Sequence, residues 1–318
     1  MKQKGGRVVV ALGGNAITQA DERGTFEGQL RNVKTTCDQI LKIIEKGYEV
    51  VVTHGNGPQA GSLLIQQEEA ARLVPPQPLD VVVAMTQGQI GYMFQQTLQN
   101  SLVERGVKKQ VATVVTQVIV DRDDPDFSDP SKPVGPFYDE RTAERLVKEK
   151  GYIIKRVRPR GEKSFRRVVP SPDPKEIVEA HLIRRLVEEG FIVIASGGGA
   201  IPVVSHNKGL EGIEAVVDKD LAGQRLATAV GADTFLILTD IDSVKLDFGE
   251  KTERGVRRMT VDEAETYMNE GHFLEGSMKP KVLACIRFLK KGGKRAAIGS
   301  LERGLEALLG EVGTAITQ

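Results

Sequence analysis

Short runs of apolar residues alternate along this chain with longer segments in which apolar residues recur three or four positions apart. The short runs predict β-strands, and the longer segments predict amphipathic helices. The predicted strands span residues 8–12, 50–53, 111–120, 192–195, 235–239 and 296–298, and the clearest predicted helices span 29–45, 176–188 and 281–291. Because this alternation is typical of parallel sheets, we expect an α/β fold with a mostly parallel sheet and helices on both faces.

One segment interrupts the alternation. Residues 121–174 are rich in proline, aspartate and basic residues, and they include the sequence RDDPDFSDPSKPVGPFY. Long insertions of this kind often cover a binding site, so we expect a small subdomain that acts as a lid. Its tail, residues 150–168, contains eight basic residues and one acidic residue, and we expect a solvated basic hairpin there.

Composition narrows the classes of function. Lys and Arg total 44 while Asp and Glu total 43, so the net charge of +1 provides no overall field that would attract nucleic acid or an anionic membrane. No apolar run approaches the ~18 residues of a membrane span, and we expect no signal peptide. The two cysteines, Cys37 and Cys285, are too few for a disulfide framework, and we expect buried thiols in a reducing cytoplasm.

Glycine-rich turns follow three of the predicted strands. A glycine lacks a Cβ, so the backbone N–H groups of such a turn can approach a bound anion closely. Ligands of open parallel sheets bind where the carboxyl ends of the strands meet. We therefore expect one anion site, with candidates from the first turn (Gly13, Gly14, Asn15), the second (Gly55, Asn56, Gly57) and the third (Gly198, Gly199).

Three lysines are candidates for phosphate chemistry, because phosphoryl transfer depends on alignment and on cations that neutralise the moving charge. They are Lys132 in SKPVGPFY, Lys219 in VVDKD and Lys281 in GSMKPKV. His54 adjoins the second glycine turn, and we interpret it as a packed or hydrogen-bonded residue rather than a catalytic one. The remaining histidines lack the spacing of zinc ligands, so we expect no metal held by the protein itself.

Taken in order, these motifs resemble those of the carbamate kinases, which belong to the amino-acid kinase superfamily. The motifs are ALGGNA, THGNGPQ, SKPVGPFY, SGGG followed by IPV, VVDKD, LTDID and GSMxPKV, and they extend over nearly the whole chain. THGNGPQ and SKPVGPFY are the most specific, because acetylglutamate, aspartate and uridylate kinases share mainly the glycine turns.

The resemblance implies an open, mainly parallel sheet of eight strands with helices on both faces and a protruding lid subdomain. Residues 1–215 would form the lobe that binds carbamate or carbamoyl phosphate, including the lid at about 121–174, and residues 216–318 would bind the nucleotide. The enzyme would interconvert ATP and carbamate with ADP and carbamoyl phosphate, with Mg²⁺ carried on the nucleotide. It would be a cytoplasmic homodimer joined through the amino-terminal lobes, and it would generate ATP during arginine breakdown.

The resemblance also implies roles for the motifs. The first glycine turn would bind the transferring phosphoryl group, and the second would hold carbamate. Lys219 and Lys281 would neutralise phosphate charge while Asp220 holds both ammonium groups, and Lys132 would arrive from the lid. The third glycine turn, together with Asp240, Ile241 and Asp242 of LTDID, would border the nucleotide. From the residues alone, LTDID is also compatible with a turn capped by aspartate.

Three positions depart from the family pattern. Ala11 stands where several related kinases have a lysine, and Lys132 is the natural substitute for that charge. Ala200 replaces a common fourth glycine after SGGG, which implies a slightly looser approach of backbone to phosphate. Lys279 occupies the variable position of GSMxPK, where we expect it to face solvent.

Other functions remain compatible with the sequence. An acid kinase of the same fold with a bulkier substrate would need an apolar or arginine-lined acceptor pocket, and no candidate arginine adjoins the glycine turns. The same chemistry could also run toward carbamoyl phosphate synthesis, and a non-catalytic nucleotide sensor could share the fold. A dinucleotide-dependent dehydrogenase is disfavoured, because GGNAIT does not supply GxGxxG.

Overall fold

An eight-stranded sheet forms the centre of the protein in the computed structural model, which describes residues 5–19, 22–158 and 161–318. Its strand order is β15 (Arg258–Thr260), β17 (Thr314–Thr317), β16 (Arg295–Ser300), β12 (Thr234–Thr239), β1 (Arg7–Leu12), β2 (Glu49–His54), β9 (Ile192–Ile194) and β3 (Val111–Thr113). Neighbouring strands are parallel except for β16 and β17. The predicted open, mainly parallel sheet is therefore confirmed.

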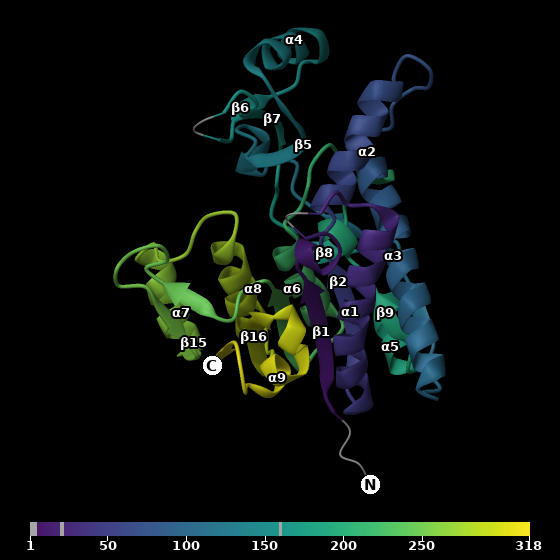
Figure 1. Cartoon of the computed structure of the whole chain (residues 1–318), viewed down its shortest axis with the longest axis vertical. Helices are drawn as coiled ribbons and strands as arrows, with labels where there is room; N and C mark the ends of the chain where they lie inside the picture. The colour runs from purple at the N-terminus through teal and green to yellow at the C-terminus, as the bar shows by residue number, and fades with distance from the viewer. Residues whose placement is uncertain (1–4, 20–21, 159–160) are drawn as a thin grey trace.

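Helices cover both faces of this sheet (Figure 1). The first face packs against α1 (Phe26–Glu45), α3 (Leu79–Glu104) and α9 (Gly304–Leu309), and the second packs against α5 (Ala180–Glu188), α6 (Lys219–Ala229) and α8 (Met278–Lys290). Side chains of β1 alternate between the two layers, since Val8 and Val10 join the first while Val9 and Ala11 join the second. Burial on both faces explains why β1 reads as an uninterrupted apolar run.

The predicted strand over residues 111–120 is wrong as a single element. Only β3 belongs to the central sheet, whereas β4 (Gln117–Ile119) joins a second sheet in the order β11 (Gly209–Gly212), β10 (Ile201–His206), β4 and β8 (Glu176–Ile177). The chain turns at Thr116, which is buried. There the side chain of Gln87 accepts from the Thr116 N–H at 2.8 Å and donates to its carbonyl at 3.0 Å, so the break leaves both groups satisfied.

The predicted helix over residues 176–188 begins too early. Glu176 and Ile177 pair with β4 as strand β8, and helix α5 starts only at Ala180. The helix predicted at 29–45 lies within α1, and the one predicted at 281–291 extends one residue beyond the end of α8. The remaining elements are α2 (Gly57–Ala70), α7 (Val261–Asn269), the hairpin β13 (Val244–Leu246) and β14 (Arg254–Val256), and the short helices η1 (Gly14–Ala16), η2 (Pro125–Phe127), η3 (Gly197–Gly199) and η4 (Leu301–Arg303).

The insertion forms a separate three-stranded antiparallel sheet that projects above the central sheet (Figure 1). Its strands are β5 (Lys132–Tyr138), β7 (Phe165–Val169) and β6 (Ile154–Arg156), and helix α4 (Glu140–Lys150) covers them. The basic tail is a hairpin, but its side chains are not simply solvated: the guanidinium of Arg156 lies 4.7 Å from the ring centre of Phe165, and that of Arg167 lies 4.2 Å from that of Tyr152. Arg160 of this tail lies outside the described residues.

Both cysteines are buried free thiols, as expected. Burial raises the pKa of each thiol, so neither is a reactive thiolate near neutral pH. Within the part of the chain that the structure describes, no helix has the length and apolar character needed to cross a membrane.

Candidate active site

The three predicted glycine turns meet at the carboxyl edge of the central sheet. The Gly55 N–H donates to the carbonyl of Leu12 at 3.1 Å, which holds the turn after β2 beside the turn after β1. A Cβ on Gly55 would lie 3.6 Å from the backbone nitrogen of Gly14, and one on Gly198 would lie 2.2 Å from Nδ2 of Asn56. The third turn therefore fits against the second only because Gly198 lacks a side chain.

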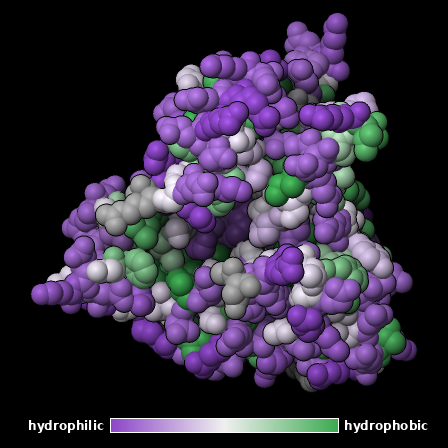
Figure 2. Space-filling model, turned by 45° about the horizontal axis from the view of Figure 1, so that its top comes forward, coloured by the Kyte–Doolittle hydropathy of each residue, from purple (hydrophilic) through white to green (hydrophobic). Residues whose placement is uncertain are grey.

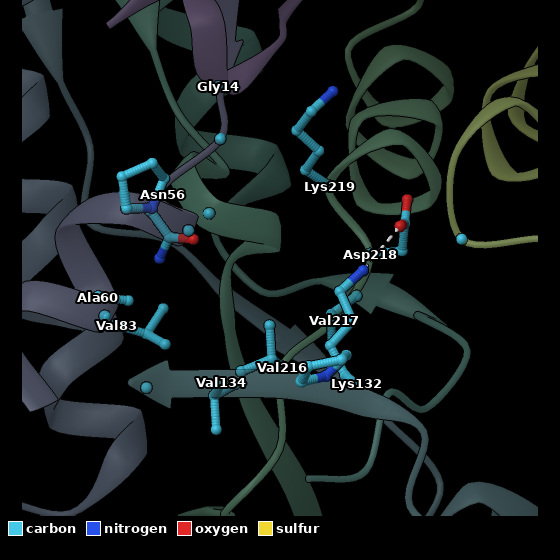
Figure 3. Close-up of a pocket in the computed structure, with 18 of the residues that line it drawn as sticks. Gly14, Asn56, Ala60, Val83, Lys132, Val134, Val216, Val217, Asp218 and Lys219 are labelled. Atoms are coloured by element: carbon cyan, nitrogen blue, oxygen red, sulfur yellow. Dashed lines mark hydrogen bonds and ion pairs between the residues drawn. The ribbon is translucent and has the colours of Figure 1, made fainter. Parts of the chain in front are cut away.

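A cavity of about 640 Å³ opens beside these turns, and residues of strand β5 in the insertion also line it. On the face drawn in Figure 2, a recess near the centre has mostly hydrophilic visible walls. Most of the predicted site residues line this cavity: Gly14, Gly55, Asn56, Gly57, Lys132, Gly198, Lys219, Asp220 and Lys281. Figure 3 shows Gly14 and Asn56 on one side of it, with Lys132 and Asp218 on the other. Residues that lie far apart in the sequence thus line one cavity.

Asp220 joins two of the lysines. Its carboxylate oxygens accept separately from the ammonium groups of Lys219, at 2.5 Å, and Lys281, at 3.0 Å. Burial opposes ionisation of Asp220, but the charges and hydrogen bonds of the two lysines outweigh burial and keep its pKa below the usual value. Burial likewise opposes the charge on Lys281, but Asp220 raises the pKa of that ammonium. Asp220 and Lys281 are therefore both ionised near neutral pH.

Lys132 reaches the cavity from strand β5 of the inserted three-stranded sheet (Figure 3). Its ammonium donates to Oδ2 of Asp218 at 3.1 Å. The other oxygen of Asp218 accepts from the backbone N–H of Asp220 at 2.9 Å and caps the start of α6. Asp218 was not predicted to line the cavity: an aspartate directly before a helix signals an N-cap, but nothing in the local sequence signals its contact with Lys132.

His54 is a packed residue, in agreement with its interpretation from sequence. Its ring is 1% exposed and is stacked on Phe94 with 6.0 Å between ring centres, and its Nδ1 lies 2.9 Å from the carbonyl oxygen of Gly55. Burial, with a smaller contribution from the nearby charge of Lys219, lowers the pKa of His54 to about 4. The imidazole is therefore neutral at physiological pH and contacts the second glycine turn through the carbonyl of Gly55.

The LTDID residues line a second, smaller cavity. Asp240, Ile241 and Asp242 surround a space of about 290 Å³ together with Phe248 and Leu274. Ser277, at the start of α8, borders both this cavity and the larger one. A single extended ligand could therefore lie across both spaces.

Some predicted residues do not line the main cavity. Gly13 is held against the β12 backbone, where its N–H donates to Leu238 at 2.8 Å, and Asn15 borders a separate polar pocket beside Asp240. Gly199 has a packing role, since a Cβ there would lie 2.2 Å from the carbonyl oxygen of Val217. Gly198 lies beside Asn56, at the end predicted for the acceptor, and the LTDID cavity does not include it.

Arg166, which was not a candidate from the sequence, lines the same cavity as the glycine turns. Its Nε and Nη2 both donate to the carbonyl oxygen of Gly135, at 3.1 and 2.8 Å. Gly135 has φ of 69°, a left-handed conformation that favours glycine. Strands β5 and β7 are paired, so Arg166 on β7 lies beside the turn in β5. Two of its donors are therefore bound to that turn.

The three departures from the family pattern have local explanations. Ala11 is fully buried in the core rather than exposed to the cavity. Ala200 is buried with φ of 66° and ψ of 168°, a region that glycine occupies far more readily, so this position carries backbone strain. Lys279 pairs with Glu275, and its side chain remains 36% exposed.

No cluster of three or more His, Cys, Asp or Glu side chains suited to a metal ion occurs among residues 5–19, 22–158 and 161–318. Both oxygens of Asp220 bind lysines, and both oxygens of Asp218 are also engaged. Mg²⁺ is often bound through substrate phosphates and water with few protein ligands. The residues present are therefore compatible with a magnesium ion that arrives on a nucleotide.

Comparison with known proteins gives one consistent result. The sequence profile described as the amino acid kinase family matches residues 6–300. The chain is 56% identical to a carbamate kinase of Pyrococcus horikoshii, over 98% of this chain and 99% of the relative, and 57% identical to one of Thermococcus kodakarensis, over 98% and 99%. A structure of carbamate kinase from Giardia lamblia bound to AMP-PNP superposes with a TM-score of 0.93 at 41% identity, covering 98% of each chain.

Proposed function

This chain belongs to the amino acid kinase family, and its relatives place it among the carbamate kinases of that family; we propose that it catalyses reversible phosphoryl transfer between ATP and carbamate. The products are ADP and carbamoyl phosphate. The observation that carries the proposal is the pair of lysines held by Asp220 beside the glycine turns in one cavity. Such a site offers fixed cations and backbone donors to a moving phosphoryl group.

In the proposed reaction, an oxygen of carbamate attacks the γ-phosphorus of ATP. A bond forms between that oxygen and phosphorus, while the bond from phosphorus to the β,γ-bridging oxygen breaks and leaves its electron pair on ADP. The turn from Gly55 to Gly57 would hold carbamate, and Lys219 and Lys281 would neutralise charge on the transferred group and on the leaving phosphate. Carbamate is already an anion, so the step needs no general base.

The nucleotide would lie across the two cavities. Its base would occupy the smaller one, where Ile241, Phe248 and Leu274 offer apolar surface, and its phosphates would pass Ser277 toward Lys281. Asp240 and Asp242 would border the ribose. Magnesium bound to the phosphates would neutralise part of their charge.

The setting of the enzyme is also a proposal. We place it in the cytoplasm, because two buried free thiols suit a reducing compartment. We expect a homodimer joined through the amino-terminal lobes, and we expect the physiological direction to be ATP formation during arginine breakdown. We propose no nucleic-acid or membrane partner, given a net charge of +1.

One observation favours a second candidate, an acid kinase with a bulkier substrate. Arg166 borders the cavity, as an arginine-lined acceptor pocket would require. Its Nε and Nη2 are bound to Gly135, however, and this leaves it poorly placed as a carboxylate clamp. The high identity to carbamate kinases favours the smaller acceptor.

The decisive experiment measures ATP formation from ADP and Mg²⁺ with three phosphoryl donors in parallel: carbamoyl phosphate, acetyl phosphate and N-acetylglutamyl phosphate. Strong preference for carbamoyl phosphate is the expected result. Preference for N-acetylglutamyl phosphate would support the second candidate. Nucleotide binding without turnover of any donor would instead indicate a nucleotide sensor.

A further inference from the structure

Asp218 has two structural roles at once. Its Oδ1 accepts from the backbone N–H of Asp220 and caps α6, while its Oδ2 accepts from Lys132 Nζ at 3.1 Å. The side chain of Asp218 is 15% exposed and that of Lys132 is 33% exposed, so this ion pair lies in the cavity rather than on the outer surface. It connects strand β5 of the lid to the first turn of α6.

The lysines of the cavity differ in how they are held. Lys219 and Lys281 share Asp220, whose side chain is only 3% exposed and which lies in the same helix as Lys219. Lys132 instead reaches from another subdomain to the carboxylate of Asp218, which also accepts a backbone N–H and so caps α6. A phosphoryl group carries more negative charge than a carboxylate and offers more acceptor oxygens. It therefore competes effectively with Asp218 for the Lys132 ammonium.

We propose that Asp218 is a positioning residue that restrains Lys132 in the ligand-free enzyme and gives it up to the transferring phosphoryl group. This inference rests on the proposed function and deepens it. Part of the attraction between Lys132 and the acyl phosphate is then offset by the loss of the Lys132–Asp218 pair. Removing the charge of Asp218 should tighten binding of the acyl phosphate only while Lys132 is present.

The variant Asp218→Asn separates the two roles of the residue. Asparagine caps helices about as well as aspartate, so the start of α6 is preserved while the charge that holds Lys132 is lost. Because a partly exposed ion pair contributes modestly, we expect the KM for carbamoyl phosphate to fall roughly fivefold at saturating ADP. In the Lys132→Ala background, the same substitution should leave that KM unchanged.

Two kinetic results would overturn the proposal. An equal fall of KM in both backgrounds would mean that Asp218 acts on the phosphate directly, by repulsion. A rise of KM with Lys132 present would mean that Asp218 assists binding instead of competing with it. The variant Glu211→Gln is a matched control, because Glu211 pairs with Arg122 of the insertion at 2.8 Å but lies outside the cavity; it should change nothing.

A second readout is independent of catalysis. In ligand-free protein, the backbone amides of residues 132–138 should exchange with deuterium faster in Asp218→Asn and in Lys132→Ala than in the wild type. The double variant should exchange at the same rate as the single variants. If exchange is unchanged in both single variants, Asp218 does not restrain Lys132, even if turnover is normal. Absence of turnover in the wild-type enzyme would refute the proposed function, and the exchange data would still report on the restraint.

Discussion

Asp220 sets the charge balance of the active site at the scale of single residues. It is almost fully buried, and each of its oxygens binds a different ammonium group. The local sequence made Lys219 and Lys281 candidates, whereas the role of Asp220 came from the resemblance to carbamate kinases. Asp218 and Arg166 were missed, because their partners, Lys132 and Gly135, are brought to them only by the fold.

The variant Asp220→Asn should keep the shape of the side chain and remove its charge. Lys219 and Lys281 would then repel each other, and we expect kcat for ATP formation to fall by roughly 10²-fold or more. Loss of one partner of a buried ion pair should also lower the free energy of unfolding by roughly 3 kcal/mol. Steady-state kinetics and urea unfolding measure the two effects. The exposed, remote Asp38→Asn is the control, and a folded Asp220→Asn enzyme with normal kcat would remove Asp220 from the mechanism.

His54 should make the protein sensitive to mild acid. Its pKa is about 4 in the folded protein and about 6.5 when unfolded, so the unfolded chain binds a proton first as the pH falls. The contribution of neutral His54 to the free energy of unfolding is fully present above pH 6.5 and is lost as the pH falls toward 4. At pH 5 the free energy of unfolding should be lower by about 2 kcal/mol.

Urea unfolding at pH 7.5 and pH 5.0 tests whether stability falls in this direction. His54→Gln should be less stable at pH 7.5 than the wild type but should lose about 2 kcal/mol less on acidification. The exposed His181→Gln should behave like the wild type. If His54→Gln shows the same pH dependence as the wild type, the buried imidazole does not titrate as described.

At the scale of elements, the third glycine turn is defined by tight packing. Gly199 has φ of 93°, and a Cβ there would approach the carbonyl of Val217 to 2.2 Å. Because that contact is with backbone, Gly199→Ala should lower the free energy of unfolding by about 3 kcal/mol or more.

A matched glycine gives the opposite expectation. Gly88 lies exposed within helix α3, and a Cβ there meets nothing within 4 Å, so Gly88→Ala should raise stability by about 0.5–1 kcal/mol. Thermal or urea unfolding of both variants provides the comparison. Equal effects at the two positions would show that the third turn tolerates a side chain.

Element prediction from sequence worked where an apolar run is buried on both faces or where a helix has one apolar stripe. The strands at 8–12 and 235–239 and the helix at 29–45 are examples. It failed at 111–120, because the break at Thr116 depends on hydrogen bonds from Gln87, which lies on a distant helix. Such a partner leaves no local signal in the apolar pattern.

At the scale of the whole molecule, the two cavities predict that ADP and carbamoyl phosphate depend on different residues for binding. Phe248 lines only the smaller cavity and is 57% exposed. Phe248→Ala should raise the KM for ADP by roughly tenfold through loss of aromatic packing, and it should leave the KM for carbamoyl phosphate unchanged. Phe26→Ala, which removes a ring of similar exposure from the start of α1, is the control. Parallel changes in both KM values would contradict this assignment.

The position of β1 in the sheet has a consequence for biosynthesis. This strand is made before both of its neighbours: Val9 pairs on one side with Val51 and on the other with Phe235, which is made much later. One edge of β1 therefore stays open until β12 has been made, and unpaired strand edges are prone to aggregation. We infer that both edges of β1 are paired only after β12 has been made, so nascent chains should depend on chaperones until β12 emerges.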